Sequence, residues 1–187
     1  MREASSRPMI SGNEIRELIL SDLEKDLPGI PQECGKGLAQ AASICLEDQE
    51  HTSGVQLSVD GDFSQQFRLI WGAHADQVRR IGDDPDDTAE QGAYGIAVLL
   101  ISHLTGLTIF ERSRKGNGFD FWLGSDGDTL FQKKVRLEVS GVRKGSQTEI
   151  RARLRQKKEE NRWGGTALPA YVTVVEFGEP GSRVVKR

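Results

Sequence analysis

Cysteine and histidine are scarce in this chain of 187 residues, and neither type is arranged as a metal site. Its two cysteines, Cys34 and Cys45, form no CxxC motif, and His51, His74 and His103 show no metal-ligand spacing. This scarcity excludes a zinc finger. It also favours reduced thiols in a cytoplasmic protein over a disulfide framework.

Long apolar runs are missing as well. The longest candidate, residues 93–104, is shorter than the roughly 20 residues of a membrane span and predicts a buried helix instead. The first residues lack the continuous apolar core of a secretory signal. The sequence also contains no P-loop, nucleophile elbow or dinucleotide fingerprint. We therefore expect a cytoplasmic protein that does not enter a membrane.

Charge is distributed unevenly, although the formal net charge is only −3. Residues 82–91 contain five acids and no base, whereas residues 143–162 contain eight bases and three acids. A local positive excess of this kind can follow a phosphate backbone. The alternative explanation is a charged helix face that only contacts solvent.

The first part of the chain, residues 1–82, is predicted to be an N-terminal extension of helices and a β-hairpin. Ser11 and Glu14 have the spacing of a capping box, and a helical apolar stripe follows them. This extension is a candidate partner-binding region. Its patterns predict a helix from Ser11, a second helix over 37–49, a hairpin over 55–71 and a short helical segment near 74–81.

The second part, residues 83–187, is predicted to be an α/β core. Its patterns alternate between periods typical of helices and of strands. The predicted order begins with a helix that starts at Asp84-Pro85 or at Asp87-Thr88 and ends at Gly106. It continues with strands over 107–113, 118–124 and 134–142, a helix over 146–161 and a strand over 169–178. We therefore expect a mixed sheet flanked by helices.

Two acids lie inside the apolar strand patterns of this core. Asp120 is in GFDFWLG and Glu138 is in VRLEVSGV. A buried carboxylate is costly unless it is paired or holds a metal ion. Glu90 falls on the apolar face of the preceding helix, so three carboxylates could meet and bind a hard cation. The alternatives are an ion pair of Asp120 with Arg136 and a cross-strand ion pair for Glu138.

This element order, with an acid on the second strand and Glu-x-x on the third, resembles the core of the PD-(D/E)XK, or restriction endonuclease-like, nuclease superfamily. The resemblance covers roughly residues 86–178. It implies a hydrolase that uses Mg²⁺ or Mn²⁺ to cleave DNA phosphodiester bonds, within a bacterial antiphage or restriction system.

The resemblance also implies a role for each matching residue. Asp120 would be the bridging metal ligand, and Glu138 would be the second carboxylate ligand. Glu90 matches the acid on the first core helix, which often binds metal through water. Gln147 matches a supporting polar residue on the helix after the third strand.

Ser140 departs from the superfamily pattern, which usually has a lysine two residues after the glutamate. Serine cannot supply the cation that orients water and stabilises developing negative charge. The candidates for a displaced cation are Lys144, Arg143, Arg151 and Lys157, and Lys144 is the one assigned to catalysis.

Two functions follow from these observations. The first is a metal-dependent DNA nuclease that works with a protein partner or as a homo-oligomer. The second is a catalytically inactive subunit of nuclease fold that binds a partner protein or a nucleic acid within a larger complex. The absence of the motif lysine at Ser140 is the feature that favours the second function.

Overall fold

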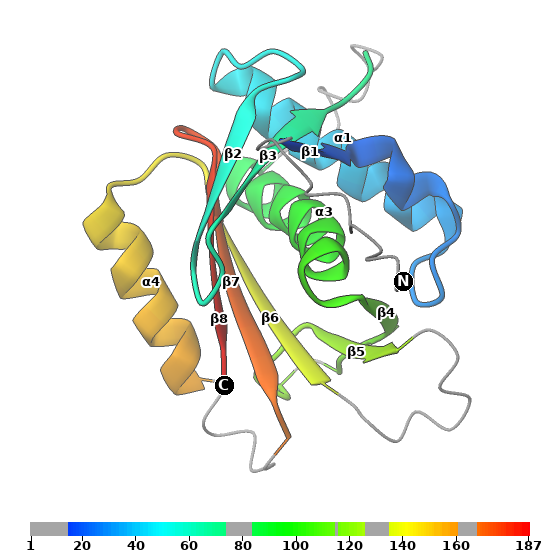
Figure 1. The fold of residues 1–187 in the computed structure, drawn as a ribbon, viewed down its shortest axis with the longest axis vertical. Coiled ribbons are helices and arrows are strands. Elements are labelled where there is room, and N and C mark those ends of the chain that lie inside the picture. Colours follow the sequence, from blue (N-terminus) through cyan, green and yellow to red (C-terminus); the bar gives the residue numbers. More distant parts are fainter. Residues whose placement is uncertain (1–14, 74–83, 115, 126–134, 161–167) are drawn as a thin grey trace, which may run out of the picture.

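The computed structural model describes residues 15–73, 84–114, 116–125, 135–160 and 168–187. These residues form an α/β fold in which helices flank a mixed sheet (Figure 1). The elements in chain order are β1 (Arg16–Ile19), the 3-10 helix η1 (Leu20–Glu24), α1 (Gln32–Asp48), β2 (Gln56–Gly61), β3 (Gln65–Ile70), α3 (Pro85–Thr105), β4 (Leu107–Arg112), β5 (Phe121–Ser125), β6 (Val135–Val142), α4 (Gln147–Glu160), β7 (Ala170–Glu176) and β8 (Gly181–Lys186).

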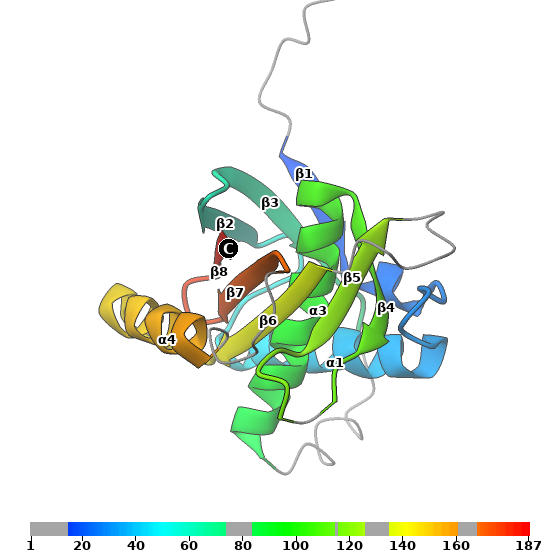
Figure 2. The ribbon, with the colours of Figure 1, turned by 90° about the horizontal axis from the view of Figure 1, so that it is seen from below.

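The sheet contains eight strands in the order β1-β3-β2-β8-β7-β6-β5-β4. Helix α3 covers one face with α1 packed against it, and α4 covers the other face alongside β7 (Figures 1 and 2). The larger hydrophobic core lies between the sheet and α1 with α3, and a smaller cluster lies beneath α4. Within the described residues, no helix has the length and apolar character needed to cross a membrane.

The predicted order of helix, three strands, helix and strand is confirmed by α3, β4, β5, β6, α4 and β7. Strands β4, β5 and β6 pair antiparallel, and β6 pairs parallel with β7. A parallel pair needs a crossover connection, and α4 provides it. Helix α3 starts at the predicted signals, with the Asp84 side chain accepting from the Asp86 N–H, and it ends at Gly106 with a φ of 71°.

The predicted N-terminal helix is wrong in the part that the structure describes. Residues 16–24 form β1 and a 3-10 helix, because β1 pairs with β3 and buries Leu18 while η1 buries Leu20 and Leu23. This tertiary pairing overrides the helical spacing of the apolar residues. Ser11 and Glu14, like the helix predicted near 74–81, lie outside the described residues.

The hairpin of the first part is confirmed as β2 and β3, and the second helix is confirmed with an earlier start at Gln32. Strand β8 is not among the predicted elements. It lies between β2 and β7, so the hairpin and the core share one continuous sheet. The division at residues 82 and 83 remains a prediction about function.

Glycine in α3 lets the two helices of the main core pack closely. A Cβ atom built at Gly92 would lie 2.9 Å from the Cα of Ala42 on α1. This distance is too short for a carbon atom against rigid backbone, so any larger residue must push the helices apart. In contrast, a Cβ at Gly37 on the exposed side of α1 would have no atom within 4 Å.

This contrast predicts opposite effects for two glycine-to-alanine substitutions in helices. Gly92→Ala should lower the free energy of unfolding by about 1–3 kcal/mol, through overpacking. Gly37→Ala should raise it by about 0.5–1 kcal/mol, because alanine loses less backbone entropy in a helix. Urea denaturation followed by circular dichroism measures both, and equal stability of the two variants would contradict the packing described.

Candidate active site

Asp120 lies immediately before β5, at the end of the sheet where β5 begins its pairing with β6. Its backbone N–H donates to the Leu137 carbonyl over 2.9 Å. Its side chain then reaches β6, because the Val139 N–H donates to Oδ2 over 2.8 Å. The carboxylate is therefore anchored by backbone, and Asp120 is not a mid-strand residue as its apolar surroundings suggested.

The other oxygen of Asp120 faces α3. The Tyr94 hydroxyl lies 3.0 Å from Asp120 Oδ1 and 2.5 Å from Glu90 Oε1. The Glu90 and Asp120 carboxylates are thus within two hydrogen-bond lengths of each other. Glu90 is exposed and Asp120 is half-buried, so this pair of acids lies at the edge of solvent.

Burial is the main cause of a raised pKa at Asp120, and the nearby negative charge of Glu90 adds to it. The hydrogen bonds from Val139 and Tyr94 and the positive charge of Lys157 act in the opposite direction. The net effect disfavours the ionised form in the folded protein. Perturbed carboxylates of this kind concentrate at functional sites, although buried structural ion pairs also produce them.

Glu138 points to the opposite face of the sheet, toward α4. Its neighbours Leu137 and Val139 belong to the core beneath α3, and side chains alternate between faces along a strand. Glu138 is only 4% exposed, and Lys157 Nζ lies 2.7 Å from Glu138 Oε1. The buried carboxylate is therefore compensated by a cation from α4.

Lys157 contacts one predicted ligand carboxylate, that of Glu138, and its charge acts on the other, that of Asp120. It forms an ion pair with Glu138, and its positive charge partly opposes the rise in the pKa of Asp120 that burial causes. Ser140 shares the face of Glu138. A cation from α4 thus reaches the face on which the superfamily pattern would place its lysine. Of the four displaced cations considered from the sequence, Lys157 is the one with a described contact to a predicted ligand.

A close approach between α3 and β6 brings Glu90 to this position. A Cβ atom at Gly141 would collide with the carbonyl oxygen of Ala89, the residue before Glu90. Glycine at this position in β6 therefore allows the first turns of α3 to lie directly on the strand.

A cavity of about 540 Å³ opens beside these residues. Its charged lining is predominantly basic toward α4 and acidic toward α3. The charged residues that line it are Asp86, Glu90, Arg143, Lys144, Glu149, Arg153 and Lys157. Such a mixed lining suits a ligand that carries both phosphate groups and bound cations.

Two predicted site residues are placed differently. Gln147 lines a separate cavity of about 360 Å³ beside β2 and β8, together with Asp60 and Arg183, and no described contact joins it to Asp120. Lys144 lines the candidate cavity, but its stem lies against Gly178 in the turn after β7. Its described contacts therefore do not include the carboxylates.

Tyr94 is the site residue that the sequence reasoning missed. It follows Glu90 by four residues on the predicted apolar face of α3. An aromatic residue at such a position is expected to pack in the hydrophobic core. The available signal was its hydroxyl, since a buried tyrosine needs a polar partner for that group.

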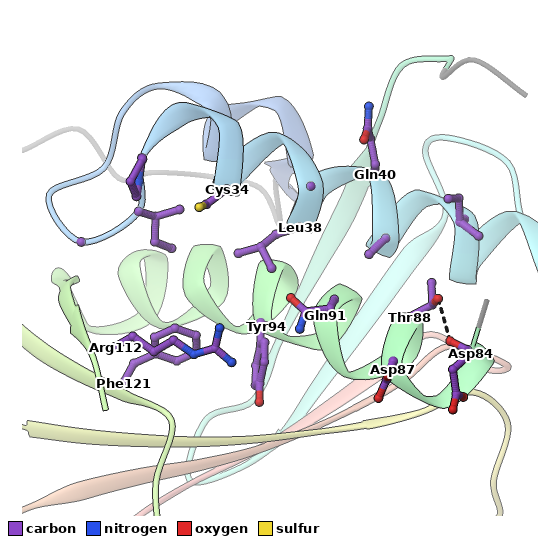
Figure 3. Close-up of a pocket in the computed structure, with 16 residues that line it drawn as sticks. Cys34, Leu38, Gln40, Asp84, Asp87, Thr88, Gln91, Tyr94, Arg112 and Phe121 are labelled. Atoms are coloured by element: carbon purple, nitrogen blue, oxygen red, sulfur yellow. Dashed lines mark hydrogen bonds between the residues drawn. The ribbon is translucent and has the colours of Figure 1, made fainter. Parts of the chain in front are cut away.

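Tyr94 also forms part of a second cavity, of about 850 Å³, between α1 and α3. Figure 3 shows its ring among the lining residues, with the hydroxyl directed away from α1. The lining is mainly apolar on the α1 side, and Asp84, Asp87 and Thr88 lie toward one end. The Tyr94 ring therefore lies between this 850 Å³ cavity and the carboxylates of Glu90 and Asp120.

Within the described ranges, no group of three acidic, histidine or cysteine side chains is arranged to hold a metal ion. Glu138 faces Lys157, while Glu90 and Asp120 share the Tyr94 hydroxyl. A hard divalent cation bound beside Tyr94 would have the oxygens of two carboxylates, Glu90 and Asp120, as ligands. Both carboxylates accept from the Tyr94 hydroxyl, and Asp120 also accepts from the Val139 N–H.

Comparison of this chain with protein-family models, curated proteins and solved structures finds no match.

The burial of Asp120 predicts a pH-dependent stability difference. A carboxyl group whose pKa is higher in the folded state than in the unfolded state stabilises the fold at low pH. That contribution is lost as the pH rises through the folded-state pKa. Asp120→Asn should therefore have a higher urea midpoint than the wild type at pH 7, and the gain should shrink as the pH falls toward 4. This behaviour is expected of a residue retained for function at some cost in stability.

The control is Asp60→Asn, because the Asp60 side chain is 57% exposed. It should show no comparable gain at pH 7. A lower midpoint for Asp120→Asn at every pH would mean that the charge of Asp120 stabilises the fold, contrary to the direction described.

Proposed function

We propose that this protein is a metal-dependent nuclease that hydrolyses DNA phosphodiester bonds, with a core of restriction endonuclease-like type. The observation that carries the proposal is the contact between Lys157 Nζ and Glu138 Oε1, at 2.7 Å, in reach of the Asp120 charge. Lys157 provides a cation on the α4 side of the sheet, where the superfamily pattern has a lysine and this chain has Ser140. The element order from α3 to β7 supports the proposal independently.

In this proposal Asp120 and Glu90 hold a Mg²⁺ or Mn²⁺ ion at the edge of the cavity. Such an ion polarises the phosphate, lowers the pKa of bound water and neutralises charge on the leaving oxygen. Glu138 keeps Lys157 in place, and the Lys157 ammonium stabilises negative charge that develops on the phosphate oxygens. The basic residues Arg143 and Arg153 in the same cavity contact neighbouring phosphates.

The defence role and the protein partner implied by the superfamily resemblance remain predictions. The basic side of the cavity supports a nucleic-acid substrate, because Arg143 and Lys144 from the loop after β6 line it together with Arg153 and Lys157 from α4. The sequence of residues 143–162 is compatible both with such a basic surface and with a charged helix face that only contacts solvent. In the structure these basic side chains line a concave surface.

A second function is favoured by a specific observation. The described acids form one group around Tyr94 and another with Lys157, rather than one cluster of three. This arrangement suits an inactive subunit of the same fold that binds nucleic acid through its basic cavity. Such a subunit would bind DNA without a divalent ion and would not cleave it.

Cleavage assays on Lys157 and Lys158 variants test the proposed cation. With Mg²⁺ or Mn²⁺ and plasmid DNA, Lys157→Ala should reduce the cleavage rate by about 10²–10³-fold, as expected when a charge-stabilising group is removed. Lys158→Ala is the matched control, since the neighbouring residue points elsewhere on α4, and it should retain the wild-type rate. Equal rates for the two variants would remove Lys157 from the mechanism.

Because Lys157→Ala leaves Glu138 without this ion pair, the variant's fold must be checked separately. Circular dichroism and urea denaturation serve that purpose, and the double variant Glu138→Gln/Lys157→Met removes both charges together. The double variant should fold and remain inactive.

A thermal scan separates the two proposed functions. A ligand that binds only the folded state raises the melting temperature. Mg²⁺ or Mn²⁺ should therefore raise the Tm of the wild type and leave that of Asp120→Ala unchanged, and Asp120→Ala should not cleave DNA. DNA binding by the wild type with no metal-dependent Tm shift and no cleavage would favour the inactive subunit.

A further inference from the structure

The 850 Å³ cavity between α1 and α3 has the volume and the lining of a small-molecule site. Such sites measure roughly 300–1,000 Å³ and are mostly apolar, with a few polar groups that orient the ligand. The apolar lining comes from the loop before α1, from α1 and from β5, and it consists of Ile30, Pro31, Leu38, Ala41, Ile44 and Phe121. Among the described residues, none lines both this cavity and the 540 Å³ cavity of the proposed function.

Arg112, at the end of β4, brings a positive charge to this apolar cavity. Its guanidinium lies over the Tyr94 ring, 5.7 Å from the ring centroid, and Figure 3 shows it extending toward Tyr94 along the cavity. Within the part of the chain that the structure describes, no carboxylate forms an ion pair with Arg112. A guanidinium stacked on a ring keeps its N–H groups in one plane, which suits the two oxygens of a carboxylate.

Gln91 adds a neutral hydrogen-bonding group at the same place. It lies on α3 three residues before Tyr94, and Figure 3 shows its amide in the space between α3 and α1. A side-chain amide donates hydrogen bonds from its NH₂ group without adding charge. Arg112 and Gln91 can therefore donate to one anionic group, whose total charge the single guanidinium balances.

The charges at the other end of the cavity limit what this anion can be. Asp84 and Asp87 line that end, and they precede Tyr94 on α3 by about 10–15 Å along the helix axis. Their negative charge opposes a doubly charged head group and a second anionic group on the ligand. The lining therefore favours a molecule with one negative charge, placed at Arg112, and an apolar body.

We propose that the cavity between α1 and α3 binds a small apolar monocarboxylate. The carboxylate pairs with the Arg112 guanidinium and accepts a hydrogen bond from Gln91. The apolar tail lies along α1, where the lining extends from Cys34 to Ile44, or about 15 Å. A medium-chain fatty acid has this chemistry and fits this length. The inference is independent of the proposed nuclease, because it involves a different cavity and needs neither metal nor DNA.

Isothermal titration at pH 8 with four related probes tests the ligand class. Octanoate should bind the wild type, and acetate, which lacks the apolar tail, should show no binding in the same concentration range. Binding of 1-octanol, which lacks the charge, and of octyl phosphate, which carries a second charge, should be weaker than binding of octanoate. An affinity for 1-octanol or octyl phosphate equal to that for octanoate would overturn the proposal, as would a wild type that does not bind octanoate.

Arginine variants test the pairing with the head group. Arg112→Gln should raise the octanoate dissociation constant by about 10–100-fold, as expected for the loss of a hydrogen-bonded charge pair. It should leave the 1-octanol dissociation constant unchanged, because the apolar walls remain. Arg114→Gln is the matched control, since Arg114 is not among the residues that line the cavity. Equal weakening of octanoate and 1-octanol by Arg112→Gln would show a structural role for Arg112 and overturn the proposal.

The thiol of Cys34 reports whether octanoate occupies this cavity. Cys34 is exposed and lines the cavity, whereas Cys45 is buried and burial raises the pKa of its thiol to about 12. A thiol reagent should therefore modify Cys34 first. Saturating octanoate should slow this reaction, and octanoate bound without any slowing would place the ligand elsewhere and overturn the proposal.

A steric block provides a second test of location. Gly37 lines the cavity, and an added Cβ atom there would have no atom within 4 Å, so a larger side chain is accommodated without disturbing the fold. Gly37→Leu should fill part of the cavity and weaken the binding of octanoate and of 1-octanol together. Wild-type affinity of Gly37→Leu for both probes would contradict binding between α1 and α3.

Discussion

The anchoring of the Asp120 carboxylate is the interaction on which the arrangement of the site depends. It accepts hydrogen bonds from the Val139 N–H of β6 and from the Tyr94 hydroxyl of α3, so it ties the start of β5 to two other elements. Lys157 of α4 acts on the same carboxylate through its charge. A shift of any one of these elements would change the position of this acid relative to the others.

The alternation of side chains between the two faces of the sheet explains why the Glu138–Lys157 ion pair and the pair of Glu90 and Tyr94 lie on different sides. Alternation along β6 directs Glu138 toward α4, whereas Glu90 and Tyr94 approach from α3. Asp120 lies at the beginning of β5, where its side chain can reach past the strand edge. The site therefore forms at the end of the β5–β6 pairing, and both helical layers contribute to it.

The element order of the second half was predictable from periodicity and from the signals at Asp84 and Gly106, because these are local features of the chain. Strand β1 and its pairing with β3 were not predictable, because the helical spacing of the apolar residues over 15–23 is also compatible with a strand followed by a 3-10 helix. The roles of Lys157 and Tyr94 depend on tertiary contacts. Spacing in the sequence did not separate Lys157 from the other three candidate cations, and Tyr94 resembled an ordinary core aromatic residue.

The nuclease proposal depends on whether a divalent ion binds between the two acids that share the Tyr94 hydroxyl. The most direct measurement is an anomalous difference map from crystals of the protein grown with Mn²⁺. We predict a manganese peak bonded to oxygens of both Glu90 and Asp120, on the side of the 540 Å³ cavity. A map from well-diffracting crystals with no manganese peak at these carboxylates would contradict the account.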